Sequence, residues 1–204
     1  MVMHGNELSR TSDVSLHPEF ADRYTTKFID DGTGVTPGNV TGWFSEDFTW
    51  EEVSTLRLRT VNDDNPGPMD GIYGFLKFDE MLDYVGELSE QLGWKVGVYP
   101  ETKLANYFAS IDLPLEDGFV ASLESHGYCG YDENKVCQAT LADPATGPAV
   151  LQSFSQESLR RLEAMTEGLT TVCLINGGSV GVNKVSVDGK EADEALIKGI
   201  GEYR

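Results

Sequence analysis

Lys95-Val-Gly-Val-Tyr-Pro-Glu-Thr-Lys103 is a short apolar run that ends in a proline, followed by a carboxylate and an amine. Alternate residues of an extended chain point to one face, so the side chains of Glu101 and Lys103 are predicted to share a face. Sites of parallel α/β proteins lie at the carboxyl ends of strands. There a carboxylate can hold a divalent cation and a lysine can bind phosphate. The alternative interpretation is an ordinary salt bridge on a solvated rim.

Helix and strand patterns alternate around this segment from residue 75 onward. Apolar residues at helical spacing predict an amphipathic helix over 79–92 that Gly93 ends. The other predicted elements are helices over 115–126, 156–167 and 191–203, and strands over 95–101, 149–154 and 170–175. This alternation predicts a parallel sheet with helices packed outside it. The apolar strand 170–175 is predicted to be covered on both faces.

The first part of the chain has a different pattern. Met1-Val-Met3 predicts the end of a strand with His4 at its tip, where a lone histidine is more often structural than catalytic. Residues 14–74 are rich in turn-forming residues and lack sustained periodicity, which indicates a functional insertion or a disordered loop. Within them, Thr49 and Glu52 predict a capping box on a short helix. No linker is visible, so residues 1–204 are predicted to form one domain.

Composition excludes some function classes. The chain has 204 residues, enough for one sizeable core, and its 15 Lys and Arg against 34 Asp and Glu give a net charge of −19. Nucleic acid is excluded as a partner, because binding a polyanion requires clustered positive charge. No apolar run predicts a transmembrane helix, and the first residues carry no signal-peptide pattern. Cys129 and Cys137 could form a disulfide or remain free thiols, so the compartment stays open. His126 is predicted to cap a helix C-terminus.

Four separated segments carry recognisable motifs. In chain order they are Val2-Met-His-Gly-Asn-Glu-Leu-Ser-Arg-Thr-Ser-Asp-Val14, Asp70-Gly-Ile-Tyr-Gly-Phe-Leu-Lys-Phe-Asp-Glu-Met-Leu82, Val98-Tyr-Pro-Glu-Thr-Lys103 and Leu151-Gln-Ser-Phe-Ser-Gln-Glu-Ser-Leu-Arg-Arg-Leu162. Together they resemble the glycerophosphodiester phosphodiesterase family. The first is similar to the family's His-Asp segment with its Leu-x-Arg-Thr-x-Asp continuation, and the third to its Pro-Glu-x-Lys strand end. They follow the order that the family has and span residues 2–162.

The resemblance implies an α/β fold, a partial TIM (β/α)₈ barrel of the phospholipase C-like phosphodiesterase type. Residues 14–74 would be the insertion between its second and third strands. The implied activity is metal-dependent hydrolysis of a small-molecule glycerophosphodiester, such as glycerophosphocholine, to sn-glycerol 3-phosphate and an alcohol. A lysophospholipid is the alternative substrate. The resemblance is strongest to the larger, secreted or periplasmic type of the family.

The resemblance also implies roles for individual residues. Glu101 would be a metal ligand, Lys103 a catalytic and phosphate-binding residue, and His4 one of two catalytic histidines. Gln152 and Phe154 would line the substrate groove. The implied cofactor is a divalent cation, with Ca²⁺ preferred over Mg²⁺.

The sequence departs from the family in ways that bear on activity. Family members carry a His-Arg pair and a Glu-x-Asp pair before the segment equivalent to His4, and Gly5 stands where they have Asp. A barrel of this type needs about 250 residues, and one carboxylate is too few for a cation that takes six or more oxygens. We therefore expect a fragment with little activity alone. The alternative is a non-catalytic, barrel-derived binding protein that has lost the metal site.

Overall fold

The chain divides into two compact units, Met1–Leu174 and Ile175–Arg204. The computed structural model describes residues 1–30, 38–60, 67–175, 186–187 and 190–191. In the second unit, β8 (Ser186–Val187) pairs antiparallel with β9 (Lys190–Glu191). The helix predicted over 191–203 lies outside the described residues from 192 onward. The rest of this section concerns the first unit.

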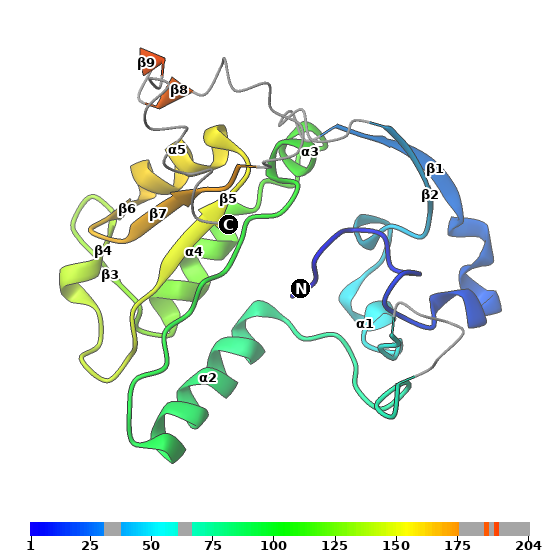
Figure 1. Ribbon diagram of the computed structural model, residues 1–204, viewed down its shortest axis with the longest axis horizontal. Helices are drawn as coiled ribbons and strands as arrows, with labels where there is room; N and C mark the ends of the chain where they lie inside the picture. The colour runs from blue at the N-terminus through cyan, green and yellow to red at the C-terminus, as the bar shows by residue number, and fades with distance from the viewer. Residues whose placement is uncertain (31–37, 61–66, 176–185, 188–189, 192–204) are drawn as a thin grey trace, which may run out of the picture. The chain divides into compact units, whose positions relative to one another are not determined.

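Parallel pairing organises the second half of the first unit. β5 (Val150–Ser153) pairs in parallel with β7 (Thr170–Cys173), and Figure 1 shows the two arrows side by side. Along the other edge of β5, the segment 98–101 makes isolated parallel bridges to Ala149 and Gln152. The predicted strands 149–154 and 170–175 are confirmed with shorter bounds. The predicted strand 95–101 forms only these bridges, although its parallel direction is as expected.

Three helices flank this parallel core. α2 (Phe78–Leu92) ends at Gly93, whose φ of 68° is left-handed, as the sequence predicts. α4 (Glu116–Ser125) and α5 (Gln156–Met165) are also confirmed, and the Ser155 side chain caps α5 by accepting from the backbone N–H of Ser158. The buried core of this region consists of Leu82, Val98, Val120, Leu123, Tyr128, Cys129, Cys137, Ala149, Leu151, Leu159 and Leu162.

A disulfide closes the loop after α4. Cys129 and Cys137 are bonded, with 5.4 Å between their Cα atoms, which settles the alternative left open above. Short strands surround this loop. They are β3 (Gly130–Tyr131), β4 (Cys137–Gln138) and β6 (Thr166–Glu167), with β4 antiparallel to β3 and parallel to β6.

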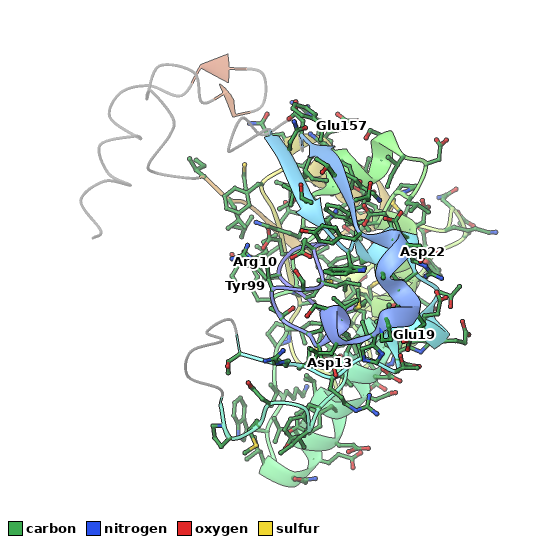
Figure 2. All side chains as sticks on the ribbon, turned by 90° about the vertical axis from the view of Figure 1, so that its right-hand side faces the viewer. Arg10, Asp13, Glu19, Asp22, Tyr99 and Glu157 are labelled. Carbon is green, nitrogen blue, oxygen red and sulfur yellow. A yellow bond between two sulfur atoms is a disulfide. The ribbon has the colours of Figure 1, made fainter. Side chains whose placement is uncertain are left out.

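The inserted residues 14–74 contain short regular elements, so the described ones are not a disordered loop. The elements are η1 (Val14–Leu16), η2 (Pro18–Arg23), β1 (Thr25–Ile29), β2 (Gly38–Gly42), η3 (Ser45–Asp47) and α1 (Trp50–Val53). β1 and β2 form an antiparallel hairpin. The predicted capping box of Thr49 and Glu52 is confirmed on α1. The acidic side chains of Glu19 and Asp22 are exposed on η2 (Figure 2).

The structure differs from the sequence predictions at three places. Met1–Met3 is not a strand, because no strand of the described residues pairs with it; its Val2 N–H donates to Leu76 O at 2.8 Å. β7 is partly exposed, because β5 is its one strand neighbour among the described residues. The helix α3 (Ala105–Ser110) was not predicted.

The α/β class is confirmed, and the pairings of the described residues form separate small sheets with no closed barrel. The partial TIM barrel therefore stays a prediction. Among the described residues, no helix has the length and apolar character needed to span a bilayer.

Candidate functional site

The segment 101–103 separates its side chains between two environments. Glu101 and Lys103 both line cavities, and Lys103 Nζ lies 3.5 Å from Glu101 Oε1. Thr102 between them is buried, and its hydroxyl lies 2.8 Å from the Ser158 hydroxyl of α5. Glu101 and Lys103 therefore lie on the same face, as the sequence predicts.

Hydrogen bonds from β5 fix this backbone on both sides of Glu101. Gln152 N donates to Pro100 O and Thr102 N donates to Gln152 O, each at 3.0 Å. The Ser153 hydroxyl donates to Thr102 O, also at 3.0 Å. The chain then turns sharply at Leu104, whose φ of 56° is unusual for a residue with a side chain. The position of Lys103 is therefore set by its neighbours on both sides.

Four of the five predicted site residues line one cavity of 830 Å³: His4, Glu101, Lys103 and Gln152. The N-terminal end of α2 and the residues just before and within α4 complete its wall. The fifth residue, Phe154, does not line it. Its ring centre lies 4.6 Å from Lys103 Nζ, so it supports the amine by a cation–π contact. Sequence analysis had assigned this ring to the groove wall.

One oxygen of the Glu101 carboxylate lacks a hydrogen bond. Its Oε1 is buried and accepts no hydrogen bond, and it faces Lys103 Nζ as an ion pair at 3.5 Å. A buried acceptor without a donor costs about 1–3 kcal/mol, so this oxygen is suited to receive a cation or a ligand donor. In the described part of the chain, no group of three His, Cys, Asp or Glu residues is arranged to hold a metal.

His4 lies just before a tight turn. Its side chain is exposed in the large cavity. Glu7 fixes the turn, because its carboxylate accepts from the backbone N–H groups of Ser9, Arg10 and Trp43 at 3.0–3.2 Å. The turn therefore holds the backbone that carries the imidazole.

The other two histidines belong to different sites. His126 caps α4, with Nδ1 2.7 Å from Ser122 O and Nε2 3.2 Å from Asp83 Oδ1, as the sequence predicted for a helix end. His17 stacks on Phe20 in the inserted region. Neither of them lines the cavity that contains His4.

Glu46 is a buried residue near the site that sequence analysis missed. Its Oε1 accepts from Lys27 Nζ at 3.0 Å, from the Tyr107 hydroxyl at 2.6 Å and from Asn6 Nδ2 at 3.3 Å. Burial, together with this carboxylate, raises the pKa of Tyr107 above its ordinary value. Glu46 thus joins the segment after His4, the inserted region and α3. Its partners lie 19 to 61 residues away, so no local pattern could indicate them.

Comparison with models of known protein families gives no match. Among curated proteins, the chain is 30% identical over 169 residues to a glycerophosphodiester phosphodiesterase of Arabidopsis thaliana, GDPD6. The matched part is 80% of this chain and 41% of that relative, so the chain spans less than half the relative's length. The chain is therefore related to the glycerophosphodiester phosphodiesterase family.

Proposed function

We propose that this chain acts as a phosphodiesterase-type hydrolase on a glycerophosphodiester bound in the large cavity. The observation that carries the proposal is the meeting of His4, Glu101, Lys103 and Gln152 on one cavity. They come from three separate segments, of which the first and last, at His4 and Gln152, lie 148 residues apart, and polar groups that converge on a cavity are a functional-site candidate. The similarity to a phosphodiesterase does not favour the alternative of a non-catalytic binding protein.

Lys103 is proposed to bind the phosphate. Its ammonium lies between the Glu101 carboxylate and the Phe154 ring, so the side chain is held in place before a ligand arrives. A compact ammonium binds phosphate oxygens as a point charge. In the overall reaction, a water oxygen bonds to phosphorus, the phosphorus–alcohol bond breaks and a proton passes to the alcohol. His4 is proposed to transfer this proton, since its imidazole is accessible in the same cavity.

We also propose a divalent cation at Glu101 Oε1. This orphaned oxygen fits one position of the cation's shell. A shell of one or two carboxylates completed by water and phosphate oxygens is typical of Mg²⁺. When bound, the cation would neutralise charge on the phosphoryl oxygens. Calorimetric titration with Mg²⁺ and with Ca²⁺ should show binding that Glu101→Gln abolishes. Equal binding by the variant would remove Glu101 from the metal site.

The phosphate role of Lys103 is tested by matched lysine substitutions. Lys103→Gln should weaken binding of sn-glycerol 3-phosphate about tenfold to hundredfold, because a charge-assisted hydrogen bond is lost. Lys95→Gln removes an exposed lysine that lines another cavity and should leave the affinity unchanged. Equal affinities for both variants would contradict the assignment. Release of choline from glycerophosphocholine, lost on His4→Ala, tests the hydrolysis itself.

The compartment is proposed to be oxidising. The support is the disulfide of Cys129 and Cys137, since such bonds persist in secreted and periplasmic proteins. Peptide mapping without reductant, on protein from its natural source, should recover the two cysteines as a linked pair. Recovery of free thiols at both positions would contradict the proposal.

A further inference from the structure

The Glu101–Lys103 pair contributes to the lining of two cavities. Both residues line the large cavity with His4 and Gln152, and both line a second cavity of 360 Å³. A phosphodiester carries two organic groups on one phosphorus. A phosphate bound at Lys103 can therefore extend one group into each cavity. The second volume lies within the range of about 300–1,000 Å³ that is usual for ligand pockets.

Most of the residues that line the small cavity are apolar. The small cavity receives side chains from the inserted region, from α3 and from the segment before α4. Its apolar lining residues are Met1, Met3, Phe48, Trp50, Val53, Leu104, Phe108, Leu113 and Leu115. Its charged residues are Glu46, Glu101 and Lys103. The wall is therefore mainly apolar, with its charges gathered at a few positions.

The two carboxylates that line the small cavity, Glu46 and Glu101, already have partners within this chain. The Glu46 carboxylate accepts from Lys27, Tyr107 and Asn6, and its side chain is only 3% exposed. Glu101 Oε1 faces the Lys103 ammonium at 3.5 Å and is also the atom proposed to hold the divalent cation. A cationic group entering the cavity would therefore meet carboxylates that already have cationic partners, and at Glu101 it would be repelled by Lys103 and by the bound cation.

The aromatic rings are also in contact with cations of this chain. Lys77 Nζ lies 5.0 Å from the Trp50 ring centre, and the Arg23 guanidinium carbon lies 4.8 Å from that of Phe48. The Lys77 ammonium would repel a quaternary ammonium and weaken the cation–π attraction that normally binds it, and the Arg23 guanidinium, itself paired with Glu52, already lies against the Phe48 ring. An uncharged alkyl group is not subject to this electrostatic repulsion.

We propose that the small cavity is the subsite for the alcohol part of the substrate, and that it takes an uncharged alkyl group in preference to a cationic one. The proposal rests on the proposed function, because it places the phosphate at Lys103. It makes alkyl esters of glycerophosphate better ligands than glycerophosphocholine. The burial of methylene groups against this apolar wall is the source of the preference.

A chain-length series tests the preference with the unmodified 204-residue protein. Calorimetric titration in millimolar Mg²⁺ would use the methyl, butyl and hexyl esters of sn-glycerol 3-phosphate and its choline ester. Each added methylene should tighten binding about fourfold, as expected for burial of a CH₂ group. The hexyl ester should bind at least about tenfold more tightly than the choline ester. Affinity that is independent of chain length, or highest for choline, overturns the subsite.

A matched pair of variants locates the effect. Leu113 lines the small cavity and is 46% exposed, so Leu113→Asp is compatible with folding. It should flatten the chain-length series, so that the longer esters lose their advantage over the methyl ester. Leu141→Asp changes an exposed leucine that lines neither cavity and should keep the series intact. An unchanged series in Leu113→Asp overturns the subsite and leaves the proposed function standing. Failure of every ester to bind, the methyl ester included, overturns both.

Discussion

The α/β region (residues 75–174) and the inserted region (described residues 14–30, 38–60 and 67–74) are stabilised in different ways. The α/β region has a continuous apolar core and a buried disulfide. Its arginine ion pairs are long, for example 3.8 Å between Arg161 and Glu116. The inserted region has a smaller apolar core and short ion pairs, such as 2.7 Å from Lys27 Nζ to Asp47 Oδ1.

The difference indicates which conditions each region tolerates. Burial of apolar groups does not depend on pH and is not screened by salt, whereas partly exposed ion pairs are screened by salt and lost when carboxylates are protonated. The inserted region contributes Glu46 and much of the small cavity wall. The proposed alcohol subsite is therefore expected to be the part of the site that is most sensitive to pH and salt. The phosphate-binding residues Glu101 and Lys103 belong to the α/β region and are expected to be less sensitive.

The largest effect is expected from a cavity in the α/β core. Leu162 on α5 is fully buried against β5 and α4. Leu162→Ala should lower the free energy of unfolding by about 3 kcal/mol, through lost burial and the void left behind. Urea unfolding followed by circular dichroism measures it. Leu141→Ala, at an exposed position, is the control, and a loss below about 1 kcal/mol for Leu162→Ala would contradict this account of the core.

The disulfide gives the next effect. Replacing Cys129 and Cys137 together by alanine should cost about 2.5 kcal/mol by the loop-entropy relation for a short loop. The wild-type protein unfolded in excess reductant should lose a similar amount. Cys173→Ala, which removes a free thiol, should change little. Equal stability of the double variant and the oxidised wild type would show that the bond does not support the core.

The sequence predicted the features that depend on neighbouring residues. The period of α2 and its end at Gly93 are local, as are the capping box on α1 and the alternation that places Glu101 with Lys103. The bond between Cys129 and Cys137 remained undecided, because both outcomes are compatible with an eight-residue spacing.

Features that depend on distant partners could not be predicted from local pattern. Met1–Met3 has the composition of a strand, but a strand forms only where a neighbouring backbone pairs with it. α3 is only six residues long and starts after a left-handed Leu104, so its periodicity is too short to detect. Glu46 gains its importance from three distant residues. The placing of His4 opposite Glu101 was expected only through the family resemblance.

Glu46 connects the two regions, and its removal should have an intermediate effect. Glu46→Gln would leave Lys27 with Asp47 alone and weaken the bond from Tyr107, costing about 2 kcal/mol. The pKa of the Tyr107 hydroxyl should fall toward its ordinary value, which absorbance titration near 295 nm detects. Glu133→Gln, at an exposed position in the disulfide loop, is the control. An unchanged Tyr107 titration in Glu46→Gln would show that Glu46 does not raise the pKa of this tyrosine.

The smallest effect concerns the pH dependence of the inserted region. Hydrogen bonds from Arg23 and from the Thr49 backbone lower the pKa of Glu52 from 4.5 to about 2. A carboxyl whose pKa is lower when folded contributes stability above pH 4.5 and loses it as the pH falls toward 2. The pair is partly exposed, which keeps the contribution small. Urea unfolding should show Glu52→Gln as less stable than wild type at pH 6, with the gap closing as the pH falls through this range. Glu51→Gln, an exposed neighbour, should follow wild type throughout. A gap of constant size across this range would mean that Glu52 stabilises α1 by packing, and the inserted region would then resemble the α/β region more closely than its ion pairs indicate.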